Sequence, residues 1–363
     1  MRNRLLQAFA AVLLLLLLLL TAHHADAAAA VISDRLRLCA ETLIPSLFGC
    51  TVLADLLRES GAGQWLGARL RLFGRALRLS PGLNGIFLVS QLAGYPVGAL
   101  LLRQECERGR RSESDAAAFS CAAFGGGPAF LVGLCGVQLF GSAAAGWTLW
   151  LSCFAANCAA ARMLSPRNTP VHPPEPVHLS APMIPQAVSG AVASLMQICG
   201  TVVLFGLAAW LCELLEIVGL LVKIGAFAGI SAQTIHAVFA AVLDVTQLTA
   251  LLHCGLQFQV LLPLTAALLS FGGLCVQTQC LALGVRGMRP GQLLCYRLLT
   301  ALLAALLTAL AVPFLPMPAV VPAMAQGAAV SQTGSVLPGI LIMLTGFPVV
   351  LHVRERPRAA RFN

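Results

Sequence analysis

Long apolar runs recur along the whole chain, and they limit its possible folds more than any other feature. A run of about 18 or more mostly uncharged residues is long enough to cross a bilayer as a helix. Hydrophobic residues make up 58% of the chain and charged residues only 10%, a composition unlike that of soluble domains. The apolar segments lie near 5–22, 41–57, 82–102, 115–140, 143–164, 187–212, 228–253, 258–284, 292–316 and 336–353. The sequence therefore predicts an all-α, polytopic helical protein of the cell membrane, with the lipid bilayer as its first partner.

The basic residues indicate how these segments cross the membrane. The chain has 23 Lys and Arg against 14 Asp and Glu, and its Arg residues lie mostly in short loops between apolar runs. Such a distribution is typical of topology signals, so nucleic acid is not expected as a partner. If segments 82–102 and 228–253 leave the membrane on the side that they entered, only Arg35, Arg37 and Lys223 lie outside. The positive-inside rule favours this arrangement, in which both segments are re-entrant.

Glycine and proline interrupt segment 82–102 near its middle, at Gly94-Tyr95-Pro96. Proline removes a backbone donor and clashes with the preceding turn, and glycine weakens a helix further. At membrane depth, non-helical backbone is tolerated only where it is buried in protein or lines a watery cavity. We therefore expect a turn within the membrane here, and we include all three residues in a candidate substrate-binding site.

The two halves of the chain resemble each other weakly. Phe124-Gly125-Gly126-Gly127 has a counterpart in Phe271-Gly272-Gly273, and GYPVGA (94–99) has one in LDVTQL (243–248) at a similar offset. With re-entrant segments the halves run in opposite directions, so we expect inverted repeats, as in many secondary transporters. The predicted organisation is an N-terminal signal-like segment or first transmembrane helix (1–40), a first repeat (41–164), a Pro/His-rich linker (165–185), a second repeat (186–316), and a C-terminal transmembrane helix with a basic tail (317–363).

A second break in the first half is predicted at Gly125, Gly126, Gly127 and Pro128. Proline fits the first turn of a helix, so a half-helix beginning here would point free N–H groups into the protein. Such helix N-termini bind anions. The alternative is a close contact between helices, because glycine lets two backbones approach each other. The sequence leaves both open.

Polar residues mark the corresponding region of the second half. Asp244 lies in an apolar segment beside Thr246 and Gln247, and a carboxyl group in lipid is costly enough to be a functional candidate. A structural hydrogen bond made by the protonated acid is the alternative. Gly272 and Gly273 form the second predicted break, and Gln277 follows within the same span. Polar side chains inside spans prefer interhelical hydrogen bonds or a cavity.

Signatures of enzymes and metal sites are absent from the sequence. It contains no GxxxxGK[ST] phosphate-binding loop, no GxSxG and no HExxH, and no spacing of Ser, His and Asp suggests a catalytic triad. The 13 cysteines are scattered through the spans without a CxxC pair or a Cys/His ligand spacing. We therefore expect neither an enzyme nor a cofactor or metal, and we interpret the cysteines as small apolar residues.

Four stretches in order, PSLFGCTVLADLL, GYPVGA, FGGGPAFLVG and SFGGLCVQTQ, resemble the YlbJ-type sporulation integral membrane proteins. These belong to the nucleoside-recognition or Gate domain group, and the resemblance covers about residues 40–315. LDVTQ resembles an acidic ExTxG-like motif of such domains, with Asp244 in place of Glu and without the glycine. The resemblance implies a multi-pass protein of endospore-forming bacteria that helps move dipicolinic acid from the mother cell into the forespore.

These observations predict a transporter for a small anionic solute. Dipicolinate, a dianion, would suit half-helix N-termini and backbone donors. Two alternatives stay open: a nucleoside-type carrier, and a scaffold for spore envelope assembly that transports nothing. Paired broken segments with buried polar groups favour a transporter, because a scaffold does not need them.

Overall fold

The computed structural model describes residues 2–166 and 177–315, and in this part of the chain every regular element is helical. The predicted C-terminal helix and basic tail (317–363) lie outside the described residues, as do residues 167–176 of the predicted linker. Among the described residues, three helices are long and apolar enough to cross a membrane: Met183–Leu214, Phe258–Leu283 and Pro290–Phe314. The bent pair Leu14–His23 and Ala25–Leu43 adds a fourth candidate.

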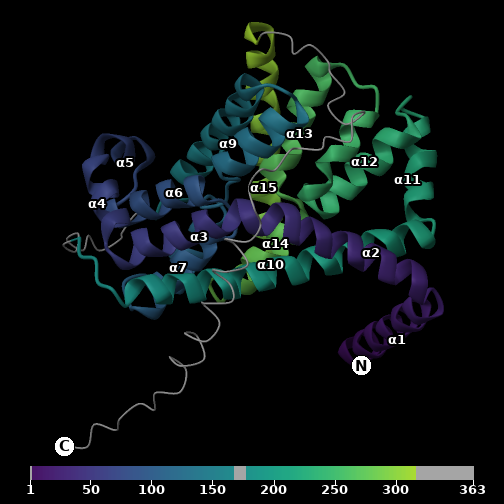
Figure 1. The fold of residues 1–363 in the computed structure, drawn as a ribbon, viewed down its shortest axis with the longest axis horizontal. Coiled ribbons are helices and arrows are strands. Elements are labelled where there is room, and N and C mark those ends of the chain that lie inside the picture. The colour runs from purple at the N-terminus through teal and green to yellow at the C-terminus, as the bar shows by residue number, and fades with distance from the viewer. Residues whose placement is uncertain (1, 167–176, 316–363) are drawn as a thin grey trace, which may run out of the picture.

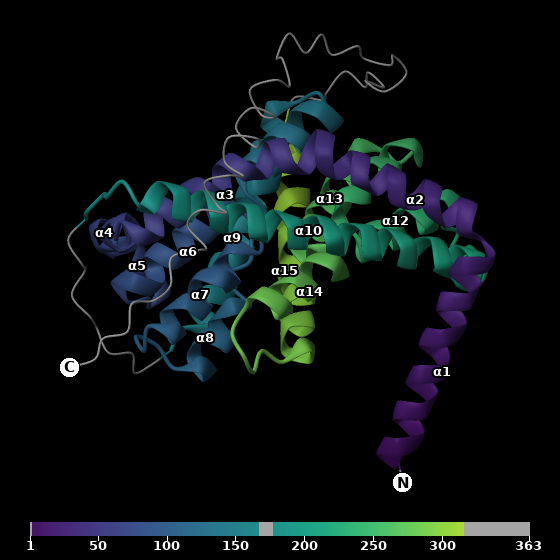
Figure 2. The same ribbon diagram turned by 60° about the horizontal axis from the view of Figure 1, so that its bottom comes forward.

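The N-terminal region differs from the predicted organisation. Helix α1 (Arg2–His23) projects from the body of the molecule (Figure 2), and the chain bends by 96° into α2 (Ala25–Leu38). A π-helical turn, η1 (Cys39–Leu43), then leads directly into α3 (Ile44–Glu59). The boundary expected at residue 40 therefore falls inside a continuous helical stretch. Alanine favours helix, and α2 gains further support by packing along α10.

Short helices make up most of the first half, because glycine and proline divide its apolar segments. Segment 82–102 breaks at Gly94-Tyr95-Pro96, and segment 115–140 breaks between Cys121 and Pro128. The elements after α3 are α4 (Ala62–Arg69), α5 (Arg71–Leu77), α6 (Pro81–Ala93), α7 (Val97–Glu107), α8 (Glu113–Ser120), the π-helix η2 (Ala129–Leu139) and α9 (Ala143–Leu164). Helices α6 and α7 pack against each other as a hairpin.

The second half contains a second hairpin. Its elements are α10 (Met183–Leu214), α11 (Ile217–Ala226), α12 (Ala232–Leu243), the 3-10 helix η3 (Val245–His253), α13 (Phe258–Phe271), α14 (Gly273–Leu283), α15 (Pro290–Ala311) and the short η4 (Val312–Phe314). Helices α12 and η3 meet at Asp244. The thiol of Cys254, after η3, lies 3.5 Å from the carbonyl of Gln233 near the start of α12, so both outer ends of this hairpin lie together.

The two hairpins approach α10 from its opposite ends (Figure 1). At the first end, the N–H of His178 donates to the carbonyl of Ser60 (3.0 Å), and Glu59 pairs with Arg108 just after α7 (3.1 Å). At the other end, Glu213 of α10 lies 2.9 Å from His236 of α12. The middle of α10 therefore lies where the hairpin tips meet.

Both halves contribute to one core. The largest cluster of buried apolar side chains combines Phe124, Leu131 and Leu149 with Leu262 and Leu269. Helix α15 packs against α9 and α13, and Figure 1 shows it running through the centre of the molecule. The halves are therefore not separate domains, and the breaks in their helices lie inside a shared interior.

Candidate functional site

In the first half, the second break packs directly on the hairpin tip. A β-carbon added at Gly127 would lie 2.7 Å from the carbonyl oxygen of Leu92, and one at Gly94 would lie 3.1 Å from the Gly127 nitrogen. Gly94 has φ +92°, which an L side chain rarely adopts. Glycine is thus required at both positions, because two backbones meet there without room for a side chain.

The second half repeats this arrangement. A β-carbon at Gly273 would lie 2.9 Å from the Val245 nitrogen at the tip of the α12–η3 hairpin, and Gly273 has φ +73°. Gly272 (φ +80°) instead faces the other half, since its β-carbon would lie 2.5 Å from the ring of Phe124. That ring also lies 5.2 Å from the ring of Tyr95, measured between centroids. All four breaks therefore converge on one region.

A cavity of about 40 Å³ lies between the two hairpin tips. The middle of α10 forms one wall through Ile198 and Val202, and α14 forms another through Cys275, Val276 and Gln279. A cavity needs roughly 10–15 Å³ of free volume to hold one water molecule, so this cavity has room for a few waters. A solute larger than a few waters enters only if the surrounding helices move apart.

Hydrogen-bonding groups of two kinds face this cavity. The hydroxyl of Tyr95 is buried without a partner in the described part of the chain. The N–H groups of Gly126 and Gly127 likewise donate to no acceptor among the described residues. Asp244 instead caps η3: its carboxylate accepts from the Thr246 N–H (3.0 Å) and hydroxyl (2.8 Å). Unused donors from the first half and a carboxylate from the second thus line the same cavity.

The structure brings some of the predicted site residues to this cavity and leaves others beside it. Those that line it are Gly94, Tyr95, Gly126, Gly127, Asp244 and Thr246. The remaining ones shape the breaks: Pro96 and Pro128 precede α7 and η2, and Gly272 and Gly273 separate α13 from α14. A β-carbon at Gly125 would lie 2.4 Å from the Gln91 side-chain oxygen, so this glycine accommodates that side chain.

Two predicted donors have other roles in the structure. The side chain of Gln277 donates to the carbonyl of Phe271 (3.2 Å), and it thereby satisfies the backbone at the break after α13. Gln247 does not line the cavity, and its N–H donates to the carbonyl of Asp244 (2.9 Å). Gln279, which follows Gln277 in the same apolar span, lines the cavity instead.

Arg297, in the middle of α15, is the main polar residue that the sequence analysis missed. Its side chain is fully buried, with a relative exposure of 0%. The guanidinium donates to the carbonyls of Cys121 (2.6 Å), Phe124 (3.3 Å) and Ser270 (3.4 Å). The Cys121 and Ser270 carbonyls lie at the C-terminal ends of α8 and α13, where the helix dipoles favour a positive charge, and the Phe124 carbonyl lies in the break that follows α8. One cation therefore stabilises the breaks of both halves.

The network around Arg297 extends to the first hairpin. Its guanidinium also donates to the side-chain oxygen of Asn157 on α9 (3.1 Å), and the Asn157 amide donates to the side chain of Gln91 on α6 (2.9 Å). The indole of Trp150 donates to the Gln91 carbonyl (3.3 Å). A chain of buried hydrogen bonds thus connects α15 to the helix that carries the Gly94 tip.

Comparison with protein-family models, with curated proteins and with solved structures finds no match to this chain. The resemblance to the sporulation membrane proteins therefore rests on the sequence motifs alone and stays a prediction. Among the described residues, no group of three or more His, Cys, Asp or Glu side chains is arranged to hold a metal ion.

Proposed function

We propose that this protein is a membrane transporter for a small solute, and that the cavity between the hairpin tips is its binding site. One observation carries the proposal: two hairpins from separate halves meet at a buried cavity that contains a carboxylate and unpaired donors. Broken elements with buried polar groups are costly in a membrane and are typical of secondary transporters.

The same proposal includes membrane topology. The hairpins α6–α7 and α12–η3 are re-entrant elements of two inverted repeats, and they enter from opposite faces of the membrane. The second hairpin contacts the C-terminal end of α10 directly, and the first lies near the N-terminal end of α10 through α3. These positions support the proposed topology, as does the position of Arg108 beside Glu59 at the outer end of the first hairpin. The protein is then a multi-pass membrane protein with its site near the midplane.

Dipicolinate, during endospore formation, is the solute that the family resemblance suggests. The donors suited to its carboxylates are the N–H groups of Gly126 and Gly127 and the hydroxyl of Tyr95. A neutral solute of the nucleoside type is the second candidate, and Asp244 favours it. That carboxylate is the one charged side chain lining the cavity, and it repels a dianion but accepts hydrogen bonds from hydroxyl groups.

Solute flux into proteoliposomes tests the proposal, with dipicolinate and a nucleoside as alternative substrates. A β-carbon at Gly126 would lie 2.2 Å from Leu131 Cδ1 and 3.4 Å from the Tyr95 hydroxyl, so Gly126→Leu crowds this wall of the cavity and displaces the Leu131 side chain. We expect this variant to abolish flux while remaining in the membrane. Gly133→Leu is the control in η2, the helix that follows this break, where a β-carbon meets nothing within 4 Å. Absence of flux of both solutes in the wild type would instead favour a scaffold.

A further inference from the structure

A larger and more polar cavity of about 270 Å³ lies between α3, α7, α10 and α14. Its lining includes Asp55 and Glu59 of α3, Arg103 of α7, and Gln186 and Gln197 of α10. Pockets that hold small ligands commonly measure about 300–1,000 Å³, so this cavity is close in size to one for a small solute. Side chains of both charges, with amide groups between them, provide donors and acceptors for a polar molecule.

This second cavity adjoins the cavity between the tips along two shared helices. On α10, Gln197 lines the larger cavity, whereas the next residue, Ile198, lines the smaller one. On α14, Leu283 lines the larger cavity and Gln279, about one turn away, lines the smaller. The two cavities therefore follow each other along the groove between α10 and α14.

A polar stripe on α10 follows the same path. Gln186, Gly190, Ser194, Gln197 and Thr201 recur at intervals of three or four residues, which places them on one face of the helix. The stripe ends at a hydrogen bond that crosses the groove, from the side chain of Gln279 to the hydroxyl of Thr201 (2.7 Å). This bond lies where the larger cavity gives way to the smaller one.

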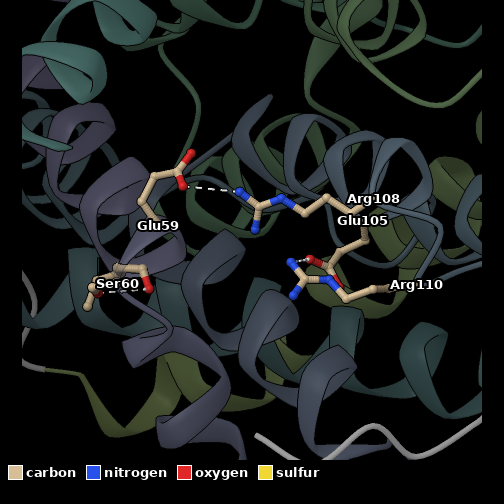
Figure 3. A network of polar contacts seen from close by, with 6 residues as sticks. Glu59, Ser60, Glu105, Arg108 and Arg110 are labelled. Carbon is tan, nitrogen blue, oxygen red and sulfur yellow. Dashed lines mark hydrogen bonds and ion pairs between the residues drawn. The ribbon is translucent and has the colours of Figure 1, made fainter. Parts of the chain in front are cut away.

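Figure 3 shows two ion pairs, one of which includes a residue that lines the larger cavity. Glu59, which lines it, pairs with Arg108 (3.1 Å), and Glu105 pairs with Arg110 nearby (2.9 Å). The side chains of Glu59 and Arg108 are 26% and 37% exposed. Partly exposed ion pairs contribute little to stability, so this contact between α3 and the loop after α7 can open at small cost.

We infer that the larger cavity is the access chamber through which the solute reaches the site between the tips from the face that carries Arg108. The hydrogen bond between Gln279 and Thr201 is the partition between chamber and site. This inference rests on the proposed transport function for its solute. It places a second, hydrated binding site for the same small polar solute about one helical turn from the first.

Labelling with a charged, membrane-impermeant thiol reagent tests the chamber. Mass spectrometry of the labelled peptides measures the reaction at each cysteine separately, so the native cysteines need not be removed. Gln197→Cys should react at least tenfold faster than Met196→Cys, and only from the face that carries Arg108. Met196 is the matched control, because it neighbours Gln197 on α10 but is 67% exposed on the apolar outer face. Equal rates at the two positions would overturn the chamber.

The labelling rate of Cys275, a native residue that lines the smaller cavity, tests the partition separately. Thr201→Val removes the acceptor of the Gln279 bond, and we expect Cys275 labelling from the Arg108 face to accelerate several-fold. Unchanged labelling would overturn the partition. The labelling rate can be measured even if the protein transports nothing. Fast reaction at position 197 together with no flux would refute the transport function but would leave the hydrated chamber standing. Slower labelling in the presence of dipicolinate or a nucleoside would identify the solute that occupies it.

Discussion

Replacing Arg297 by methionine should destabilise the protein more than any other single loss of a basic side chain. The guanidinium is buried completely and donates to four acceptors from α8, α9, α13 and the segment after α8. Methionine is an unbranched apolar side chain that is shorter and has no donor, so it would leave these acceptors buried and unpaired. Two contacts, to Cys121 (2.6 Å) and Asn157 (3.1 Å), are short enough to be the strongest.

The magnitude follows from these contacts. Leaving a buried acceptor unpaired costs about 1–3 kcal/mol, so the two short contacts predict a loss of roughly 2–6 kcal/mol. Interhelical hydrogen bonds measured in a membrane protein average only about 0.6 kcal/mol, and four of them give a similar lower limit of roughly 2 kcal/mol. With an unfolding entropy of about 2.1 cal/mol/K per residue over this chain, a loss of roughly 2–6 kcal/mol lowers the melting temperature by roughly 3–8 °C.

Thermal unfolding of purified protein in detergent micelles measures this effect. Arg297→Lys should fall between wild type and Arg297→Met, because an ammonium keeps the charge but cannot reach several acceptors in one plane. Arg289→Met, which removes an exposed guanidinium just before α15, is the matched control and should not change the melting temperature. If Arg297→Met melted with the wild type and kept its flux, the role assigned to this residue would be wrong.

Three further predictions concern the breaks, the carboxylate and the topology. Gly272→Ala should lower both melting temperature and flux, because Gly272 has φ +80° and its β-carbon would lie 2.5 Å from the Phe124 ring, whereas Gly291→Ala, in open space, should change neither. Asp244→Asn keeps an oxygen that can cap η3, so we expect wild-type amounts of protein in the membrane but an altered pH dependence of flux; an unchanged pH profile would argue against a role for this carboxyl group in transport. Cys106, near the end of α7, should react with an impermeant reagent from the cytoplasmic side, and reaction only from outside would contradict the re-entrant hairpin.

The sequence was informative where the cause of a structure is local. Gly94 and Pro96 interrupt a helix through their own backbone properties, and so do Gly127 and Pro128, which is why these breaks could be placed without coordinates. The continuous helix through residue 40 was missed because the apolar pattern alone set that boundary, although alanines precede it and favour helix.

Roles that depend on distant parts of the chain could not be placed in this way. Gln277 was assigned to the cavity, but the direction of its side chain depends on an unpaired carbonyl at Phe271. Arg297 bonds to carbonyls more than a hundred residues earlier in the chain, and no local pattern encodes that contact. The sequence did contain one signal. A single guanidinium inside the apolar segment 292–316 is costly in a membrane, which indicates that the residue has a structural or functional role.

The length of α10 has a mechanical consequence. The helix has 32 residues, so it measures about 48 Å, and a membrane core of about 30 Å holds such a helix only at a steep tilt. One end lies beside the outer end of the first hairpin and the other beside that of the second. A stiff rod that pivots about its middle moves its two ends in opposite directions. A single rocking motion of α10 would then widen the gap at one face while it narrows the gap at the other, so the two faces would open in turn without any signal passing between the halves.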